Sequence, residues 1–157
     1  MSVFRNPHDR FFKEVFSRPA VANDFLNQFL PEGIRTQLDL STLDLRKESF
    51  IDPDLQQQFA DLLYAVCLAD RQQAFVYILF EHKSYPQPLM ALQLLRYMVR
   101  IWEQGLRQAP NSPPAPIIPI VIYHGAEAWR EPLDMGALFQ GPAELRPFWP
   151  AFSYQLH

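Results

Sequence analysis

The sequence predicts an α/β fold in which a central mixed β-sheet is flanked by helices. Two uncharged runs, 75–80 and 117–123, are rich in β-branched and aromatic residues, which is typical of strands buried on both faces. Between these runs, residues 89–106 repeat apolar side chains at helical spacing. A helix that joins two strands of one sheet implies a right-handed crossover, and therefore a mixed α/β core.

The N-terminal third supplies helices and a stretch of strand. The Asn-Pro pair at 6–7 has the residue types of an N-cap and a first helical position, and aromatic residues then recur at helical spacing. Pro19 restarts this pattern and Pro31 ends it, so we expect two short helices or one broken helix. The apolar residues of 38–51 predict strand structure with a turn near 41–42.

The remaining segments complete the order helix, strand, strand, strand, helix, strand. Residues 59–68 fit a helix or a strand by pattern alone, and the turn-like run 70–73 that follows favours a strand paired with 75–80. Residues 109–116 form a Pro-rich connector. After the strand at 117–123 we expect loops and short helices, ending in a short strand at 152–156.

Length and composition indicate one domain, 1–157. The chain has 157 residues, of which 48% are hydrophobic and 20% charged, enough for one substantial core. Its net charge of −3 argues against a module that binds DNA through a basic surface alone, but less against a nuclease with metal-binding carboxylates. The N-terminus lacks the apolar stretch of a signal peptide and no uncharged run could span a bilayer, so we expect a cytoplasmic protein without membrane contact.

Asp61, Glu81 and Lys83 are the strongest candidates for chemistry. Glu81 and Lys83 are two apart at the end of an uncharged strand, so their side chains leave the same face. A hairpin between 59–68 and 75–80 would bring the carboxylate of Asp61 beside that of Glu81. Two adjacent carboxylates repel and are tolerated when a cation lies between them, and oxygen ligands suit Mg²⁺ or Mn²⁺. A lysine beside the cation can stabilise the charge of a phosphodiester under attack.

A surface role is the simpler explanation for each of these three residues taken singly, and only the trio on this strand order favours a catalytic role. His82 is expected to point away from Glu81 and Lys83, so its backbone carbonyl is a further candidate metal ligand.

Five segments carry a resemblance to a known family. They are Phe-Ala-Asp-Leu-Leu-Tyr at 59–64, Tyr-Ile-Leu-Phe-Glu-His-Lys-Ser at 77–84, Leu-Leu-Arg-Tyr at 94–97, and the stretches 8–16 and 118–125. Together they resemble the Rpn family of recombination-promoting nucleases, also labelled transposases, within the PD-(D/E)XK nuclease superfamily. The resemblance covers nearly the whole chain and implies a restriction-endonuclease-like core with the order αβββαβ.

The resemblance implies magnesium-dependent DNA cleavage, with Asp61 and Glu81 as metal ligands and Lys83 as the catalytic lysine. Family members tend to carry glutamine at the position of Lys83, whereas this chain has the lysine of the wider superfamily, which favours activity. Relatives usually continue well past the point where this chain stops, so we expect a C-terminally shortened copy of the domain.

The helix 89–106 supplies further candidates. Gln93, Arg96, Tyr97 and Arg100 fall at helical spacing, opposite an apolar stripe. That stripe comprises Leu92, Leu95, Met98, Val99 and Trp102. Gln93 and Tyr97 resemble the Gln-x-x-x-Tyr signature of RecB-like nucleases, which implies support of the active site, although a solvated polar face explains Gln93 equally well. Arg96 and Arg100 are expected to contact DNA phosphates.

Asp9, in the first turn of the first helix, has two interpretations of equal weight. It interacts with the helix dipole, or it supports the active site as the resemblance suggests.

Three functions fit these residues. The first is a metal-dependent DNA endonuclease, linked by resemblance to recombination and mobile elements, with DNA as partner and a homodimer allowed. The second is an inactive descendant that binds DNA or protein, which the acidic net charge and short length favour. The third, a strand-transfer transposase, needs a third acidic ligand and leaves Lys83 unexplained.

Overall fold

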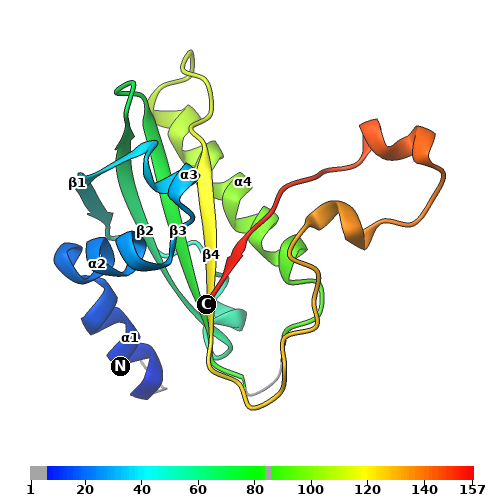
Figure 1. Cartoon of the computed structure of the whole chain (residues 1–157), viewed down its shortest axis with the longest axis horizontal. Helices are drawn as coiled ribbons and strands as arrows, with labels where there is room; N and C mark the ends of the chain where they lie inside the picture. Colours follow the sequence, from blue (N-terminus) through cyan, green and yellow to red (C-terminus); the bar gives the residue numbers. More distant parts are fainter. Residues whose placement is uncertain (1–6, 84–85) are drawn as a thin grey trace.

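The computed structural model describes residues 7–83 and 86–157, with side chains described from Arg10 onward, and shows a five-stranded mixed sheet flanked by helices (Figure 1). The strands lie side by side in chain order: β1 (Leu38–Arg46), β2 (Phe59–Leu68), β3 (Gln73–Glu81), β4 (Ile117–Tyr123) and β5 (Gln155–Leu156). The first three are antiparallel, whereas β4 is parallel to β3 and β5 is parallel to β4. This is the α/β architecture that the sequence predicts, and it is consistent with a restriction-endonuclease-like core.

Helices cover both faces of the sheet. They are α1 (Pro7–Phe16), α2 (Pro19–Phe29), α3 (Glu32–Arg35) and α4 (Met90–Gln108), with short 3-10 turns at Pro53–Leu55, Met135–Leu138 and Ala143–Phe148. Figure 1 shows α1 and α2 on one side of the sheet and α4 on the other, and an arm after β4 that leaves the sheet and returns at β5. The predicted N-cap Asn6 lies outside the described residues. None of the described helices is long and apolar enough to cross a membrane.

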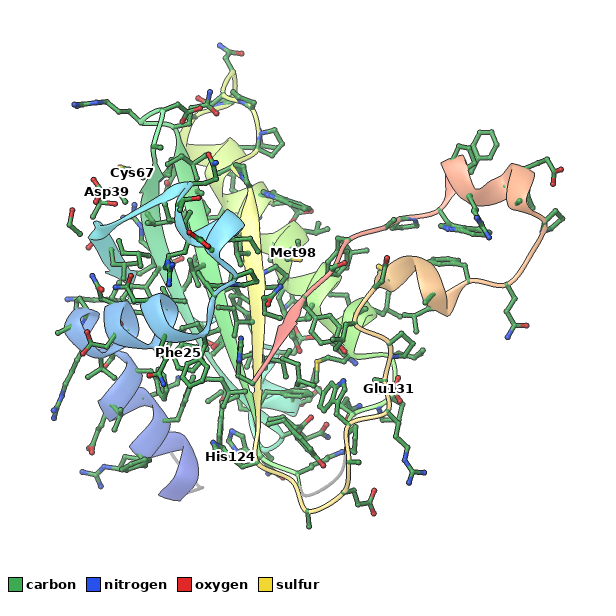
Figure 2. The ribbon with its side chains drawn as sticks, in the orientation of Figure 1. Phe25, Asp39, Cys67, Met98, His124 and Glu131 are labelled. Atoms are coloured by element: carbon green, nitrogen blue, oxygen red, sulfur yellow. The ribbon has the colours of Figure 1, made fainter. Side chains whose placement is uncertain are left out.

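The core has two halves because alternate residues of each strand point to opposite faces. On one face, Tyr64, Ile78 and Ile120 pack beneath α1 and α2. On the other, Tyr77, Leu79 and Val121 pack beneath α4. Figure 2 marks the two sides with Phe25 of α2 and Met98 of α4. Central strands covered on both faces explain why β2 and β3 are almost free of charged residues.

β1 is one bulged strand, so the predicted turn at 41–42 is wrong. The register with β2 shifts within the strand. There the carboxylate of Asp39 accepts hydrogen bonds from the amide and hydroxyl of Ser41. The hydroxyl of Thr42 donates to the carbonyl of Asp39 at 2.6 Å and accepts from the amide of Cys67 at 2.8 Å. These side chains replace missing backbone bonds, so pairing with β2 resumes after the bulge.

The buried face of α4 also differs from the predicted one. The buried residues are Met90, Ala91, Leu94, Tyr97, Met98 and Ile101. Leu92 and Val99, which the sequence assigned to the apolar stripe, are 41% and 39% exposed. The helix is rotated so that Tyr97, assigned to the polar face, points into the core between α4 and the sheet.

Candidate active site

The β2–β3 hairpin places Asp61 and Glu81 at the same end and on the same face of the sheet. In its antiparallel register Asp61 pairs with Leu79, and Phe59 pairs with Glu81. Because directly paired residues share a face, both carboxylates lie on the α4 side as diagonal neighbours, a relation in which Cα atoms are about 7–8 Å apart. Asp61 and Glu81 are also the buried charged side chains of the described residues, at 3% and 1% exposure.

Three hydrogen bonds fix the carboxylate of Asp61. Its Oδ1 accepts from the hydroxyl of Ser49 at 2.7 Å, and its Oδ2 accepts from the amide of Phe50 and the hydroxyl of Tyr77, both at 2.8 Å. Burial and the nearby Asp61 charge raise the pKa of Tyr77 well above its usual value, which keeps this hydroxyl protonated as a donor. Asp61 is therefore held in one orientation by donors from the loop before β2 and from β3.

Tyr77→Phe is expected to lower the free energy of unfolding by about 1–2 kcal/mol, because the variant keeps the buried ring and loses one hydrogen bond to a charged group. Urea unfolding of the two proteins measures the difference. Tyr123→Phe is a matched control, since that hydroxyl donates to the carbonyl of Glu127 in an exposed loop. An equal loss in both variants would show that the Tyr77 hydroxyl contributes nothing particular to the site.

Glu81 combines burial with an unsatisfied oxygen. Its Oε1 accepts a hydrogen bond from the amide of Lys83 at 3.0 Å, whereas Oε2 is buried with no hydrogen-bond partner among the described residues. Burial raises the pKa of Glu81 to about 7, although the backbone amide and the ammonium group of Lys83 oppose the rise. A carboxyl group with such a pKa exchanges its proton near neutral pH.

Lys83 lies beside Glu81, as the sequence predicts from their spacing. The ammonium group of Lys83 donates to Oε1 of Gln87 at 3.1 Å, and its positive charge acts on the Glu81 carboxyl group. Gln87 is a neighbour that sequence inspection missed, because it follows the strand in an irregular segment without a recognisable motif.

His82 faces the other side of the sheet from Glu81, in agreement with the expected alternation. Its ring lies 5.2 Å from that of Phe80, which belongs to the core half beneath α1 and α2. The amide of His82 donates to the carbonyl of Gln58 at 2.9 Å, which extends the pairing of β2 and β3 by one residue. The Oε1 of Gln58 is a second buried oxygen without a hydrogen-bond partner in the described part of the chain.

On α4, Tyr97 reaches the site from the buried side of the helix. Its ring centroid is 6.2 Å from that of Tyr77, and its hydroxyl is buried with no hydrogen-bond partner among the described residues. Burial raises the pKa of Tyr97 to about 12, and the charges of Asp52 and Asp61 add to the rise. Gln93, in contrast, contacts Arg96 at 3.5 Å. Asp9 lies in α1, and its side chain is outside the described residues.

Arg96 and Arg100 both form ion pairs with Asp52, in the loop before β2. Arg96 Nη2 lies 3.1 Å from Asp52 Oδ2, and Arg100 Nη2 contacts Oδ1. Arg100 Nη1 also donates to the carbonyl of Phe50 at 3.0 Å. The amide of Phe50 holds Asp61, so Arg100 and Asp61 bind the two backbone groups of the same residue. The sequence gives no signal for this loop, because its partners are 11 to 50 positions away along the chain.

The metal-ligand set is small. Among the described side chains, in ranges 10–83 and 86–157, no group of three or more His, Cys, Asp or Glu could hold a metal ion. A cation here would therefore rely on two carboxylates, with backbone, water and substrate oxygens completing its shell, an arrangement common for Mg²⁺.

Comparison with known proteins identifies relatives. A family model described as "Putative transposase, YhgA-like" matches residues 6–157. The recombination-promoting nuclease RpnA of Escherichia coli strain K12 is 34% identical over 122 residues, which cover 78% of this chain and 41% of the relative. RpnD of Escherichia coli O157:H7 is 31% identical over 122 residues, covering 78% of this chain and 46% of the relative.

A third relative carries a different description. The inactive recombination-promoting nuclease-like protein RpnE of Escherichia coli strain K12 is 34% identical over 128 residues, covering 79% of this chain and 41% of the relative. The chain thus spans less than half the length of these three relatives. No solved structure matches it. Because the family model covers nearly all of the sequence, the chain belongs to the family of YhgA-like transposases and recombination-promoting nucleases, Rpn.

Proposed function

We propose that this chain is an endonuclease domain that hydrolyses the phosphodiester bonds of DNA with a divalent cation, Mg²⁺ or Mn²⁺. The observation that carries the proposal is the buried pair Asp61 and Glu81 at one end of a hairpin, with Lys83 beside Glu81. Buried carboxyl groups with perturbed pKa values are typical of functional sites. The names of RpnA and RpnD support nuclease chemistry.

The open acceptor positions of the two carboxylates fit a hard cation. Each carboxylate oxygen offers about two acceptor positions. The Oδ2 of Asp61 uses both, for Phe50 and Tyr77, whereas Oδ1 accepts from Ser49 and keeps one position. The Oε2 of Glu81 is buried and unsatisfied within the described residues. One oxygen from each carboxylate is therefore suited to ligate an ion, and the backbone carbonyl of His82 is the proposed third ligand.

The cation and the side chains around it would have separate roles in the reaction. A bound cation would supply a water of lowered pKa and neutralise charge on the phosphate. Lys83, oriented by Gln87, would place a positive charge where negative charge develops on the phosphate oxygens. Tyr77 and the Ser49–Phe50 segment would hold Asp61 in a fixed orientation, so that the site needs little reorganisation during the reaction.

A binding module without catalysis is the second candidate. Two observations favour it: the three donors on Asp61 satisfy much of that carboxylate without a cation, and RpnE is described as inactive. A strand-transfer transposase with three carboxylates fits less well, because the described residues hold no group of three metal-binding side chains.

Cleavage of supercoiled plasmid in the presence of Mg²⁺ or Mn²⁺ tests the proposal. An endonuclease gives nicked and linear DNA, and chelation of the metal stops the reaction. Calorimetric titration with Mn²⁺ separates the two candidates, because a binding module should take up no ion at Asp61 and Glu81. Absence of both cleavage and ion binding would refute the nuclease.

Cleavage and Mn²⁺ binding are expected to rise with pH through about 7, the pKa of Glu81 in the folded protein. Below that pH the carboxyl group is protonated and is a poor ligand, whereas above it the carboxylate is available. Rates and Mn²⁺ affinities measured between pH 5.5 and 8.5 check this. Profiles that are flat across pH 7 would contradict the assignment of Glu81 as a ligand.

The stability of the metal-free protein, unlike its cleavage rate and ion binding, should fall as the pH rises. The folded-state pKa of Glu81, about 7, lies above the ordinary value of 4.5, so the folded state binds the proton more tightly than the unfolded chain. This stabilisation is complete below pH 4.5 and is lost as the pH rises through 7. Urea unfolding of wild type and Glu81→Gln should therefore diverge between pH 4.5 and 7, with wild type losing stability relative to the variant.

A further inference from the structure

We propose that the DNA backbone is held in a basic groove between α1 and the end of β1, rather than by the arginines of α4. This inference rests on the proposed function, because it names where that substrate binds. The groove has a volume of about 600 Å³, and Asp61 is part of its lining. Four basic residues also line it: Arg10, Lys13, Arg46 and Lys47.

One wall forms where β1 separates from β2. The last pair between these strands joins Arg46 to Leu63, and the chain then continues through Lys47 to Ser49. Because the hydroxyl of Ser49 donates to Oδ1 of Asp61 at 2.7 Å, the basic side chains at 46 and 47 are attached to the same short segment that holds the carboxylate. A phosphate bound along this segment would lie next to Ser49, which reaches the carboxylate of Asp61 on the α4 side of the sheet.

The other wall is α1, which two contacts fix against the sheet. The ring of Phe12 is buried and stacks on that of Phe80 at 4.9 Å, and the hydroxyl of Tyr64 donates to the carbonyl of Phe16. Arg10 and Lys13 are three positions apart, so they are neighbours on the helix surface, and both line the groove.

Acidic side chains moderate the charge of the groove. Glu14 and Glu48 line it together with Asp61, so four basic groups face three acidic ones. The pair formed by Arg10 and Glu14, at 3.2 Å, is 73% and 60% exposed. Exposed pairs of this kind contribute little and exchange partners readily. A phosphate can therefore replace Glu14 as the partner of Arg10.

The arginines of α4 pair with a less exposed carboxylate than those of the groove, where Arg46 pairs with Asp44 at 3.6 Å on the surface, as Arg10 does with Glu14. Arg96 and Arg100 share the carboxylate of Asp52, and Arg100 also donates to the carbonyl of Phe50. To bind a phosphate, Arg100 would have to leave the carbonyl of Phe50, the residue whose amide holds Asp61. A phosphate bound by Arg100 would therefore loosen the proposed site, whereas a phosphate bound in the groove leaves the contacts of Arg100 intact.

DNA binding can be measured apart from catalysis, in the Lys83→Ala background without divalent cation. The probe is a labelled duplex followed by fluorescence anisotropy at several salt concentrations. Arg46→Gln/Lys47→Gln should raise Kd at least 10-fold, and the slope of log K against log salt should fall by about 2, since each phosphate contact contributes about 0.9. The matched control Arg71→Gln/Arg107→Gln removes the same charge from exposed positions outside the groove and should change Kd less than 3-fold.

Glu14→Gln provides a test that misfolding cannot imitate, because it should tighten binding about 3-fold by releasing Arg10. Unchanged or weaker binding in this variant, an equal effect of the control pair, or a larger loss in Arg96→Gln would each overturn the groove. DNA binding that follows the groove variants, without cleavage by the wild type, would refute the proposed catalysis and leave this inference standing. If the wild type cleaves DNA but the groove variants leave Kd unchanged, the groove is refuted and the proposed catalysis stands.

Discussion

Lys83→Ala is expected to slow the cleavage of supercoiled plasmid at least 100-fold while leaving the fold unchanged. Removing one preorganised charge donor from a transition state typically lowers the rate by about 10²–10³. Lys83 is half-buried and its ammonium group bonds to the side chain of Gln87, so its loss opens no cavity in the core. Initial rates of nicking with Mg²⁺ give the effect, and circular dichroism verifies the fold.

Two conservative variants show which property of Lys83 matters. Lys83→Arg keeps the positive charge and should retain a measurable fraction of the rate, whereas Lys83→Gln keeps a donor for Gln87 without the charge. The resemblance to the Rpn family gives the second variant additional interest, because relatives tend to carry glutamine there. If charge on the phosphate is what Lys83 stabilises, the order of rates is wild type, arginine, glutamine, alanine. Undiminished cleavage by Lys83→Ala would assign the activity to another residue or another protein.

The hairpin that carries the site could be predicted from the sequence because two physical constraints coincide there. β2 and β3 are covered on both faces, so their residues are almost wholly apolar, and a charged residue in such a run stands out. The predicted bounds of β2 and β4 match the structure, and β3 extends the predicted strand at both ends. The alternation of side chains then placed Asp61 and Glu81 on one face without further information.

The rotation of α4 could not be predicted, because its apolar residues cover too wide an arc. Leu92 and Val99 match one stripe, and Leu94 and Ile101 match another a short way around the helix. The polar residues near Tyr97 led to its wrong assignment to the polar face of the helix. Tertiary packing decides the rotation of α4, since the side of the sheet beneath this helix presents the aromatic ring of Tyr77, against which Tyr97 lies.

The partners of Asp61 were beyond prediction for a different reason. Ser49 and Phe50 bind it from a loop whose path depends on where β1 ends, and the predicted strand ran through that loop to residue 51. The ion pairs of Asp52 with Arg96 and Arg100 bring together residues more than 40 positions apart in sequence. Such contacts follow from the assembled fold and leave no local pattern.

Asp61→Ala is expected to have the largest effect on stability of any single change at the site. The substitution leaves the amide of Phe50 and the hydroxyl of Tyr77 buried without an acceptor, whereas Ser49 lies at the surface and can bond to water. An unsatisfied buried donor costs about 1–3 kcal/mol, so two donors give a loss of about 2–6 kcal/mol. Urea unfolding measures this loss, which is a large part of the total stability of a typical domain.

Asp61→Asn separates this structural role from catalysis. An asparagine oxygen at the Oδ2 position can still accept from Phe50 and Tyr77, and its amide group can donate to the hydroxyl oxygen of Ser49, which is able to accept. We therefore expect the variant to fold with a loss of about 1 kcal/mol, within the usual range for one altered hydrogen bond. It lacks the negative charge, so Mn²⁺ binding and plasmid cleavage should disappear. A folded Asp61→Asn protein that still cleaves DNA would show that Asp61 organises the loop before β2 and takes no part in the reaction, because the geometry would survive while the proposed ligand would not.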